Sequence, residues 1–334
     1  MTDHDLTPDD FTDTARAVMN ACAGAGGTAA RMSLLAEAGL PGILAPEAAG
    51  GMDLPLGFAV PVLAAAGRGF LAAPLLETML LARAFAGVDD AVAADLAAGT
   101  TCATIAWSGA FDGTTGLVGA APLAAESDRV LVFRTDGTAV LVSKGEGVEV
   151  EAAATLEVDR PEDNIRLSKA AGPELPAERV AQLKAEAQVL RAALILGAAE
   201  DCLDRASAYA QERVQFGKPL SAYQAIQHSL ARDCLAVETI RNSIARSLSP
   251  HCATPAAAAR ATFVGAARLG SRVAESAIQV HGGMGFTWDV PLHRHLRMVK
   301  TLAAQGGAAD LLEAVAAELM AGEDSEAEEM KRAG

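Results

Sequence analysis

Two stretches in the last third of the chain combine arginine, glutamine and glycine in a way that suits an anionic ligand. The first begins at Arg213 and is followed by Gln224, and the second begins at Gln279 and holds three glycines within four positions from Gly282 onward. Arginine pairs with phosphate through two parallel N–H groups. Glycine has no Cβ, so backbone N–H groups can come close to a phosphate. These residue types are compatible with a phosphate-bearing ligand.

Each stretch also has a purely structural interpretation. Gly217 and Pro219 would form a corner between two helices and leave Arg213 on the surface. Gly282 alone would be explained as a helix C-cap, although three glycines in four positions exceed what a cap requires. The pattern is not G-x-G-x-x-G after a strand, so a doubly wound nucleotide-binding sheet has no support.

The spacing of apolar residues predicts the helices that must position these stretches. Two long helices are expected at about 183–211 and 226–248, a third from Thr254-Pro255 to about 280, and a fourth at about 308–321. Four amphipathic helices of this length favour an antiparallel bundle, which we assign to residues 171–322. Residues 323–334 form an expected solvated acidic tail.

The first half of the chain divides into a helical part and a β part. Residues 1–98 read as an N-terminal helical domain, which Thr7-Pro8 would cap and which glycines and prolines interrupt between 40 and 55. Residues 99–170 contain short β-favouring runs, with Asp136-Gly137 as a hairpin signal, and predict a small, mostly antiparallel β domain. The expected fold class is mainly α with a central β domain.

The composition excludes several classes of protein. Among 334 residues, 27 Lys and Arg face 42 Asp and Glu, and a net charge of −15 disfavours nucleic acids and anionic membranes as partners. No apolar run reaches the roughly 20 residues of a membrane span. The start of the chain lacks the features of a signal peptide. The five cysteines show no Cys-x-x-Cys spacing, so we expect a cytoplasmic protein without a metal site.

Taken together, the two stretches resemble the two C-terminal signatures of acyl-CoA dehydrogenases. Pro291 and Arg297 fit the second signature, and residues 40–51 resemble the family's N-terminal proline-glutamate-glycine-glycine turn. The resemblance covers nearly the whole chain, including the helical–β–helical order. It implies an oxidoreductase of fatty acid or sterol side-chain degradation that uses FAD, acts on an acyl-CoA and passes electrons to an acceptor flavoprotein.

In this family FAD lies at a dimer interface. One subunit holds the flavin ring, and the other grips the adenine and diphosphate. The resemblance implies the second role for a set of residues in this chain: Arg213, Gln215, Phe216, Gln224, Gln279, Gly282 and Gly283.

The chain departs from the family where the chemistry would occur. The usual base, which removes the α-proton of the thioester, is a glutamate nine residues after the position that Arg297 matches. That position is Gly306, and glycine cannot accept a proton. Some family members place the base on the first long C-terminal helix, and Glu186 lies within one residue of that register. One residue turns a helical side chain by about 100°, so a solvent-facing glutamate is the structural alternative.

The segments that hold the flavin ring in the family are also missing from the β region, which offers Trp107 instead. In the family, the base and the ring-holding segments, which this chain lacks, act on the flavin ring that a subunit itself holds. The arginine, glutamine and glycine positions, which this chain retains, bind the FAD whose ring the neighbouring subunit holds. We therefore expect the non-catalytic subunit of a heterodimer or heterotetramer, which completes the FAD site of a partner. The alternatives are a homo-oligomeric dehydrogenase using Glu186, a flavin monooxygenase-like relative, and a non-redox structural or binding paralogue.

Overall fold

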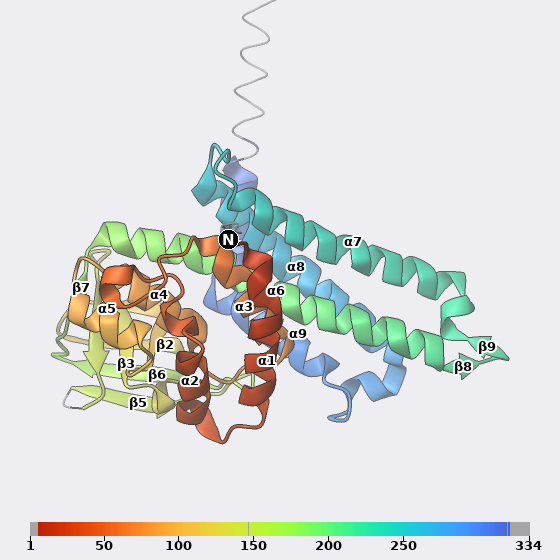
Figure 1. Cartoon of the computed structure of the whole chain (residues 1–334), viewed down its shortest axis with the longest axis horizontal. Helices are drawn as coiled ribbons and strands as arrows, with labels where there is room; N and C mark the ends of the chain where they lie inside the picture. Colours follow the sequence, from red (N-terminus) through yellow and green to blue (C-terminus); the bar gives the residue numbers. More distant parts are fainter. Residues whose placement is uncertain (1–5, 146, 319, 321–334) are drawn as a thin grey trace, which may run out of the picture.

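The computed structural model describes residues 6–145, 147–318 and 320, and it begins with a layer of helices (Figure 1). Thr7 caps the first turn, because its backbone N–H and hydroxyl donate to the Asp10 carboxylate at 2.8 and 2.9 Å. Proline at position 8 fits the first turn because its missing N–H would have no partner there. The main helices of this layer are α1 (Thr12–Ala23), α2 (Gly27–Glu37), α3 (Ala59–Arg68), α4 (Leu75–Phe85) and α5 (Asp90–Ala97).

A seven-stranded sheet follows, and it lies at one end of the molecule. Its order is β5-β6-β2-β1-β3-β4-β7, and every described pairing is antiparallel except that of β1 with β3. Strand β1 lies between β2 and β3. The chain reverses direction from β1 to β2 and again from β2 to β3, so β3 runs parallel to β1. The strands are β1 (Ala103–Phe111), β2 (Thr115–Pro122), β3 (Arg129–Arg134), β4 (Ala139–Ser143), β5 (Val148–Ala152), β6 (Glu162–Ser168) and β7 (Glu174–Leu175).

Both faces of β3 are buried, which explains its uninterrupted apolar sequence. Leu131 and Phe133 pack into the large core shared with the helices. Val130 and Val132 point the opposite way, into a smaller core enclosed by the sheet itself. The turn to β4 uses the expected Asp136-Gly137 pair, where Gly137 has φ 89°.

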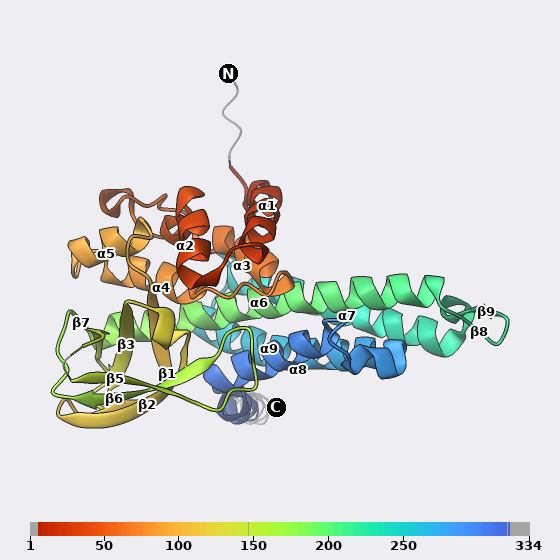
Figure 2. The same cartoon turned by 90° about the horizontal axis from the view of Figure 1, so that it is seen from below.

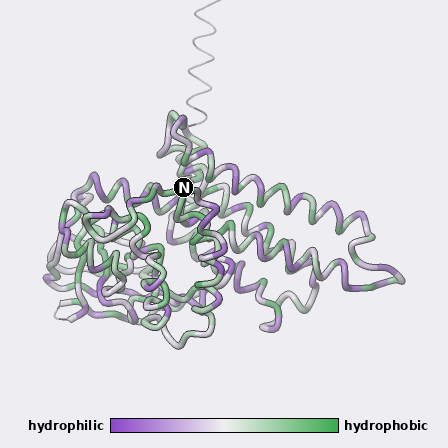
Figure 3. The backbone as a smooth tube through the Cα atoms, in the orientation of Figure 1, coloured by the Kyte–Doolittle hydropathy of each residue, from purple (hydrophilic) through white to green (hydrophobic). Residues whose placement is uncertain are grey.

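The second helical part is built around α6 (Ala177–Glu212), which runs through the molecule with the N-terminal helices on one side (Figure 2). On its other side lie α7 (Gln224–Ser247), α8 (Pro255–His281) and α9 (Leu292–Gln305), and residues 308–318 are helical as well. Hydrophobic and hydrophilic residues are interspersed along these helices (Figure 3), as expected for helices with one buried face. Within the described residues no helix is long and apolar enough to span a membrane.

Helix α9 is a helix that the sequence analysis did not identify, and the short hairpin of β8 (Val214–Gln215) and β9 (Lys218–Pro219), where a corner between helices was expected, is another missed element. The buried positions of α9 include His293, His295 and Thr301 beside Leu292 and Val299. Polar side chains on the inner face weaken the apolar periodicity from which a helix is recognised. The boundaries at 98/99, 170/171 and 322/323 stay predictions, and the expected acidic tail lies outside the described residues.

Helices α3 and α6 cross at a contact that only glycine permits. A Cβ on Gly197 would lie 1.8 Å from the carbonyl oxygen of Ala64, and a Cβ on Gly67 would lie 2.0 Å from that of Leu194. Both distances are far below van der Waals contact, so any side chain here must push the two helices apart. This contact joins the N-terminal layer to the helix that carries the candidate site.

We expect Gly197→Ala to lower the free energy of unfolding by roughly 2–3 kcal/mol or more, because overpacking a rigid contact displaces backbone. The measurement is urea-induced unfolding followed by circular dichroism. Gly265→Ala is the matched control, since Gly265 lies in α8 and a Cβ added there would meet no atom within 4 Å. Alanine there should be neutral or stabilising by about 0.5–1 kcal/mol. Equal stability of the two variants would contradict the close crossing.

Candidate functional site

Three helix ends meet at the end of the molecule opposite the sheet, and they carry the sequence-predicted residues (Figure 1). The ring of Tyr209, near the end of α6, stacks on His281 at the end of α8 with centroids 4.3 Å apart. The Tyr223 hydroxyl, just before α7, donates to the backbone oxygen of Gln215 at 2.8 Å. These two contacts bring the turn after Arg213 beside the glycine-rich loop.

A short hairpin projects from this end and carries the first group of residues. It consists of β8 (Val214–Gln215) and β9 (Lys218–Pro219), and its two turn residues Phe216 and Gly217 have φ 51° and 84°. Two successive positive φ values are typical of a tight hairpin turn, but they strain a residue other than glycine. Phe216 is nevertheless 94% exposed, so the rest of the chain gives its ring no packing.

The side chain of Arg213 also faces solvent at the base of this hairpin. Among the described residues it makes no hydrogen bond or ion pair, and Gln224 at the start of α7 is likewise exposed. An arginine whose charge no carboxylate neutralises retains all of its N–H donors for a ligand.

The three glycines of the second stretch differ in what they do. Gly285 is required by packing, because its Cβ would lie 2.7 Å from the carbonyl oxygen of Ile278. Gly282 has φ 62° and ψ −138°, a backbone conformation open essentially to glycine alone. Gly283 has neither constraint, and a Cβ there would meet nothing within 4 Å. Its backbone therefore faces open space, where a group from outside the chain can approach.

A cavity of about 440 Å³ lies between α7 and α8 and has Gln279 in its wall. Arg232 and Arg272 line it as well, and the sequence analysis identified neither. The hydroxyl of Ser276, another wall residue, donates to Asp233 at 2.5 Å. Burial raises the pKa of the Asp233 carboxyl, and the Ser276 hydrogen bond opposes that effect.

This donor set fits the diphosphate and adenine end of FAD. Arg213 supplies positive charge, Gln279 supplies an amide, and the loop at Gly283 leaves its backbone uncovered. In the cavity wall the charges of Arg232 and Arg272 are balanced by Asp233 and Glu275.

Large apolar side chains in and just after the glycine-rich loop are exposed to solvent. Their exposed fractions are 50% for Met284, 72% for Phe286 and 65% for Trp288. Exposed apolar groups around polar ones are typical of a surface that binds a partner.

Position 306, where the resemblance places a catalytic base, is sterically filled. Gly306 ends α9, and a Cβ there would lie 2.3 Å from Cζ of Phe263 on α8. The Phe263 ring is fully buried. The φ of Gly306 is −86°, which any residue adopts, so the obstacle to a glutamate is the ring and not the backbone.

An arginine in α6 fills the space next to this ring. The guanidinium of Arg191 lies 3.8 Å from the centroid of the Trp107 ring in β1 and 6.0 Å from that of Phe263. Its Nε and Nη2 have no hydrogen-bond partner in the described part of the chain. Burial is the main cause that lowers the pKa of Arg191 to about 10, and Glu77 opposes that effect. The group is therefore a buried cation at neutral pH, stacked between the sheet and the helices.

Glu186 lies one turn earlier on α6, in the contact with α4. Its Oε1 is 3.2 Å from Nε of Arg83 and accepts a hydrogen bond from the Gln182 amide at 2.9 Å. The carboxylate side chain is 15% exposed. Its role as a base stays a prediction.

Comparison with known proteins connects this geometry to a family. Residues 177–320 match the acyl-CoA dehydrogenase C-terminal domain. Acyl-CoA dehydrogenase FadE27 of Mycobacterium tuberculosis is 31% identical over 325 residues, which cover 85% of this chain and 86% of that protein.

Two solved structures share the fold across nearly the whole chain. The ChsE4–ChsE5 complex from Mycobacterium tuberculosis contains a chain that aligns with a TM-score of 0.85 and 26% identity, covering 96% of this chain and 99% of that one. A variant of the Tcur3481–Tcur3483 steroid ACAD aligns with a TM-score of 0.85 and 25% identity, covering 95% and 98%. The expected mainly helical fold with a central β part is thereby confirmed.

We expect Gly306→Glu to lower the free energy of unfolding by roughly 1–3 kcal/mol or more, because its Cβ collides with the buried Phe263 ring. Gly265→Glu in α8 introduces the same side chain where nothing lies within 4 Å, and it should leave stability nearly unchanged. Both are measured by urea-induced unfolding. If Gly306→Glu is as stable as the control, the ring moves aside readily and position 306 is not filled.

Proposed function

Because the chain belongs to the acyl-CoA dehydrogenase family, we propose that it takes part in FAD-dependent α,β-dehydrogenation of an acyl-CoA as the subunit that completes the FAD site of a catalytic partner. The observation that carries this proposal is Gly306 under the Phe263 ring. A carboxylate is absent at the matched position, and the space that it would need is occupied. Members of the family are oxidoreductases that use FAD.

The two expected parts of the FAD-binding machinery differ in whether their residues are packed or accessible. In the half that would hold this chain's own flavin ring and substrate, the Arg191 guanidinium stacks on Trp107 and lies beside Phe263. In the half that would serve a neighbour, Arg213 has no partner among the described residues and the backbone at Gly283 is open. A protein that had lost its redox role altogether would not need to keep the second half accessible.

The chemistry assigns distinct tasks to the chain's own residues. FAD, when bound, accepts the hydride that leaves the β-carbon of the acyl group. Arg213 would neutralise the cofactor's diphosphate, Gln215, Gln224 and Gln279 would bind its polar groups, and Gly282 and Gly283 would let it approach the backbone. Phe216 would pack on it or on the partner. The α-proton would have to go to a carboxylate of the partner.

The names of the similar structures support a heteromeric assembly. ChsE4–ChsE5 is described as a complex, and Tcur3481–Tcur3483 as a steroid ACAD, each with two different names. We infer a comparable partner for this chain, a bulky or ring-bearing acyl-CoA as the substrate, an electron-transfer flavoprotein as the acceptor, and a cytoplasmic location. Exposed Phe216, Phe286 and Trp288 provide the apolar surface that such a partner would cover.

We expect the isolated chain to show no turnover of an acyl-CoA with an artificial electron acceptor, since position 306 offers no base. The same assay on the chain together with the acyl-CoA dehydrogenase subunit that co-purifies with it should give turnover. Robust turnover by the isolated chain would refute the non-catalytic role. If Glu186→Gln then abolishes that turnover, the alternative of a self-sufficient dehydrogenase with a displaced base is correct.

We expect Arg213→Ala to weaken FAD retention in the heteromer by about one to two orders of magnitude. A charge-assisted contact of this kind contributes roughly 1.5–3 kcal/mol, and about 1.4 kcal/mol corresponds to tenfold. Arg213→Lys should recover only part, because an ammonium cannot form two parallel hydrogen bonds. The measurement is flavin content per heteromer after gel filtration.

Arg166→Ala is the matched control, since Arg166 is an exposed arginine on β6 that pairs with Glu151 at 2.6 Å and with no other carboxylate among the described residues. It should retain FAD fully. An intact complex in which Arg213→Ala keeps the same flavin content as this control would show that Arg213 does not bind the cofactor.

A further inference from the structure

A second group of arginines lines a groove between the N-terminal helices and α6, separate from the glycine-rich loop. Two cavities of about 390 and 340 Å³ adjoin there and share Met19, Gly69, Phe70 and Arg205 in their walls. Among the described residues that line them, the charged ones are five arginines and two aspartates: Arg16, Arg31, Arg68, Arg205, Arg294, Asp159 and Asp201. We name this the arginine groove. It is a positive region in a chain whose net charge is −15.

Three of these arginines are paired with carboxylates. Arg294 donates two hydrogen bonds to Asp159 at 2.8 and 2.7 Å. Arg205 donates to Asp201 at 2.5 Å. Arg68 lies 2.8 Å from Asp204, a residue that does not line the groove. Asp201 also contacts Arg68 at 3.4 Å and the buried His295 ring at 2.9 Å, so its charge is shared among several donors.

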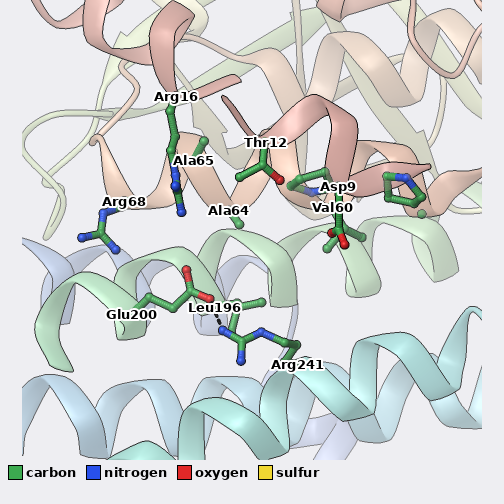
Figure 4. Close-up of a pocket in the computed structure, with 13 residues that line it drawn as sticks. Asp9, Thr12, Arg16, Val60, Ala64, Ala65, Arg68, Leu196, Glu200 and Arg241 are labelled. Carbon is green, nitrogen blue, oxygen red and sulfur yellow. Dashed lines mark hydrogen bonds and ion pairs between the residues drawn. The ribbon is translucent and has the colours of Figure 1, made fainter. Parts of the chain in front are cut away.

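Within residues 6–145, 147–318 and 320, the other two arginines have no carboxylate partner. Arg16 on α1 makes no hydrogen bond or ion pair within the described residues, and its side chain extends from α1 toward α6 (Figure 4). Arg31 on α2 donates to the backbone oxygens of Cys22 and Ala72 at 3.3 and 3.4 Å. These carbonyls fix the guanidinium in place without neutralising it. The groove thus holds two uncompensated positive charges.

The floor of the groove is rigid. Phe70 has φ 53°, a strained left-handed conformation, which the surrounding contacts maintain. Its ring stacks on His295 with centroids 4.1 Å apart, and the Arg294 guanidinium lies 4.0 Å from it. A rigid site loses little conformational entropy when a ligand binds.

The continuation of the groove over α3 differs in charge. There a smaller cavity of about 220 Å³ shares Arg16 and Arg68 but adds Asp9, Glu200 and Arg241 (Figure 4). Arg241 lies 2.6 Å from Glu200 and is neutralised by it. Asp9 then adds one further negative charge at that end. The excess of positive charge is confined to the part near Arg16 and Arg31.

We propose that the arginine groove binds a phosphate dianion, either free or as the monoester group of a small molecule. Arg31 lines one of the two adjoining cavities and Arg16 the other, so their guanidinium groups give both a positive charge that attracts a phosphate dianion. Planar guanidinium N–H groups match the oxygens of a phosphate. The wider cavity is larger than a single ion, so it has room for the organic part of a monoester. This proposal does not depend on the FAD site, with which the groove shares no residue.

The test is isothermal titration calorimetry of the full chain at pH 7.5 with inorganic phosphate and, separately, with glycerol 3-phosphate. Saturating FAD is present, and chloride at matched ionic strength is the reference. We expect one saturable site per chain for phosphate and none for chloride. Tighter binding of glycerol 3-phosphate would identify a monoester as the ligand, and equal or weaker binding would identify free phosphate.

Variants locate the site. Arg16→Gln with Arg31→Gln should weaken binding by roughly tenfold or more, since both uncompensated charges are removed, and Arg31→Lys should weaken it less. Arg213→Ala and Arg166→Gln lie outside the groove and should bind phosphate as the unaltered chain does. No saturable binding, equal binding by the double variant, or loss in Arg213→Ala would each overturn the proposal. Because Arg16 is exposed and has no partner within the described residues, Arg16→Gln alone tests it without risk to folding.

Discussion

The buried cation of Arg191 constrains the arrangement of the whole molecule. A charged group removed from water is costly unless neighbouring groups compensate it. Here the face of the Trp107 ring and the carboxylate of Glu77 favour the charged form, whereas Arg160, which lies 3.2 Å from Glu77, opposes it. Trp107 belongs to the sheet, Glu77 to the N-terminal helices and Arg191 to the central helix. The three parts of the fold must therefore keep one relative position for this charge to be tolerated.

Residues 157–162, which end at the first residue of β6, also hold the sheet and the two helical parts together. Arg160 binds Glu77 on α4, Asp159 binds Arg294 on α9, and Glu162 accepts a hydrogen bond from Gln305 at 2.8 Å. Burial is also the main cause that raises the pKa of Glu157 to about 7, so this segment carries a carboxyl that is partly protonated near neutral pH. A stretch of six residues thus ties the sheet to both helical layers. Such a junction leaves the space beside Gly306 closed, whereas the far ends of α6, α7 and α8 remain accessible.

The sequence allowed the coarse architecture to be predicted, because long apolar periodicities dominate it. The helices near 183–211, 226–248 and 254–280 and the hairpin at Asp136-Gly137 were all identified from local patterns. The residues at the junction were not, because their meaning depends on contacts between distant segments. Arg191 interrupts an otherwise apolar run from 189 to 199, and this signal could have indicated a buried charge. Nothing local to position 263 indicates that its ring lies over Gly306.

The distribution of exposed apolar groups supports the proposal that the chain functions in an assembly. Phe216 combines a strained backbone with a ring that touches solvent over nearly its whole surface, and Phe286 and Trp288 lie exposed on the neighbouring loop. In an isolated protein this arrangement costs free energy twice, through strain and through apolar exposure. A partner that covers these rings would offset both costs. The interior near Gly306 has the opposite character, with Phe263 fully buried and Trp107 stacked on Arg191. A closed interior and an open far end are the arrangement expected of a chain that contributes half of a site to another subunit.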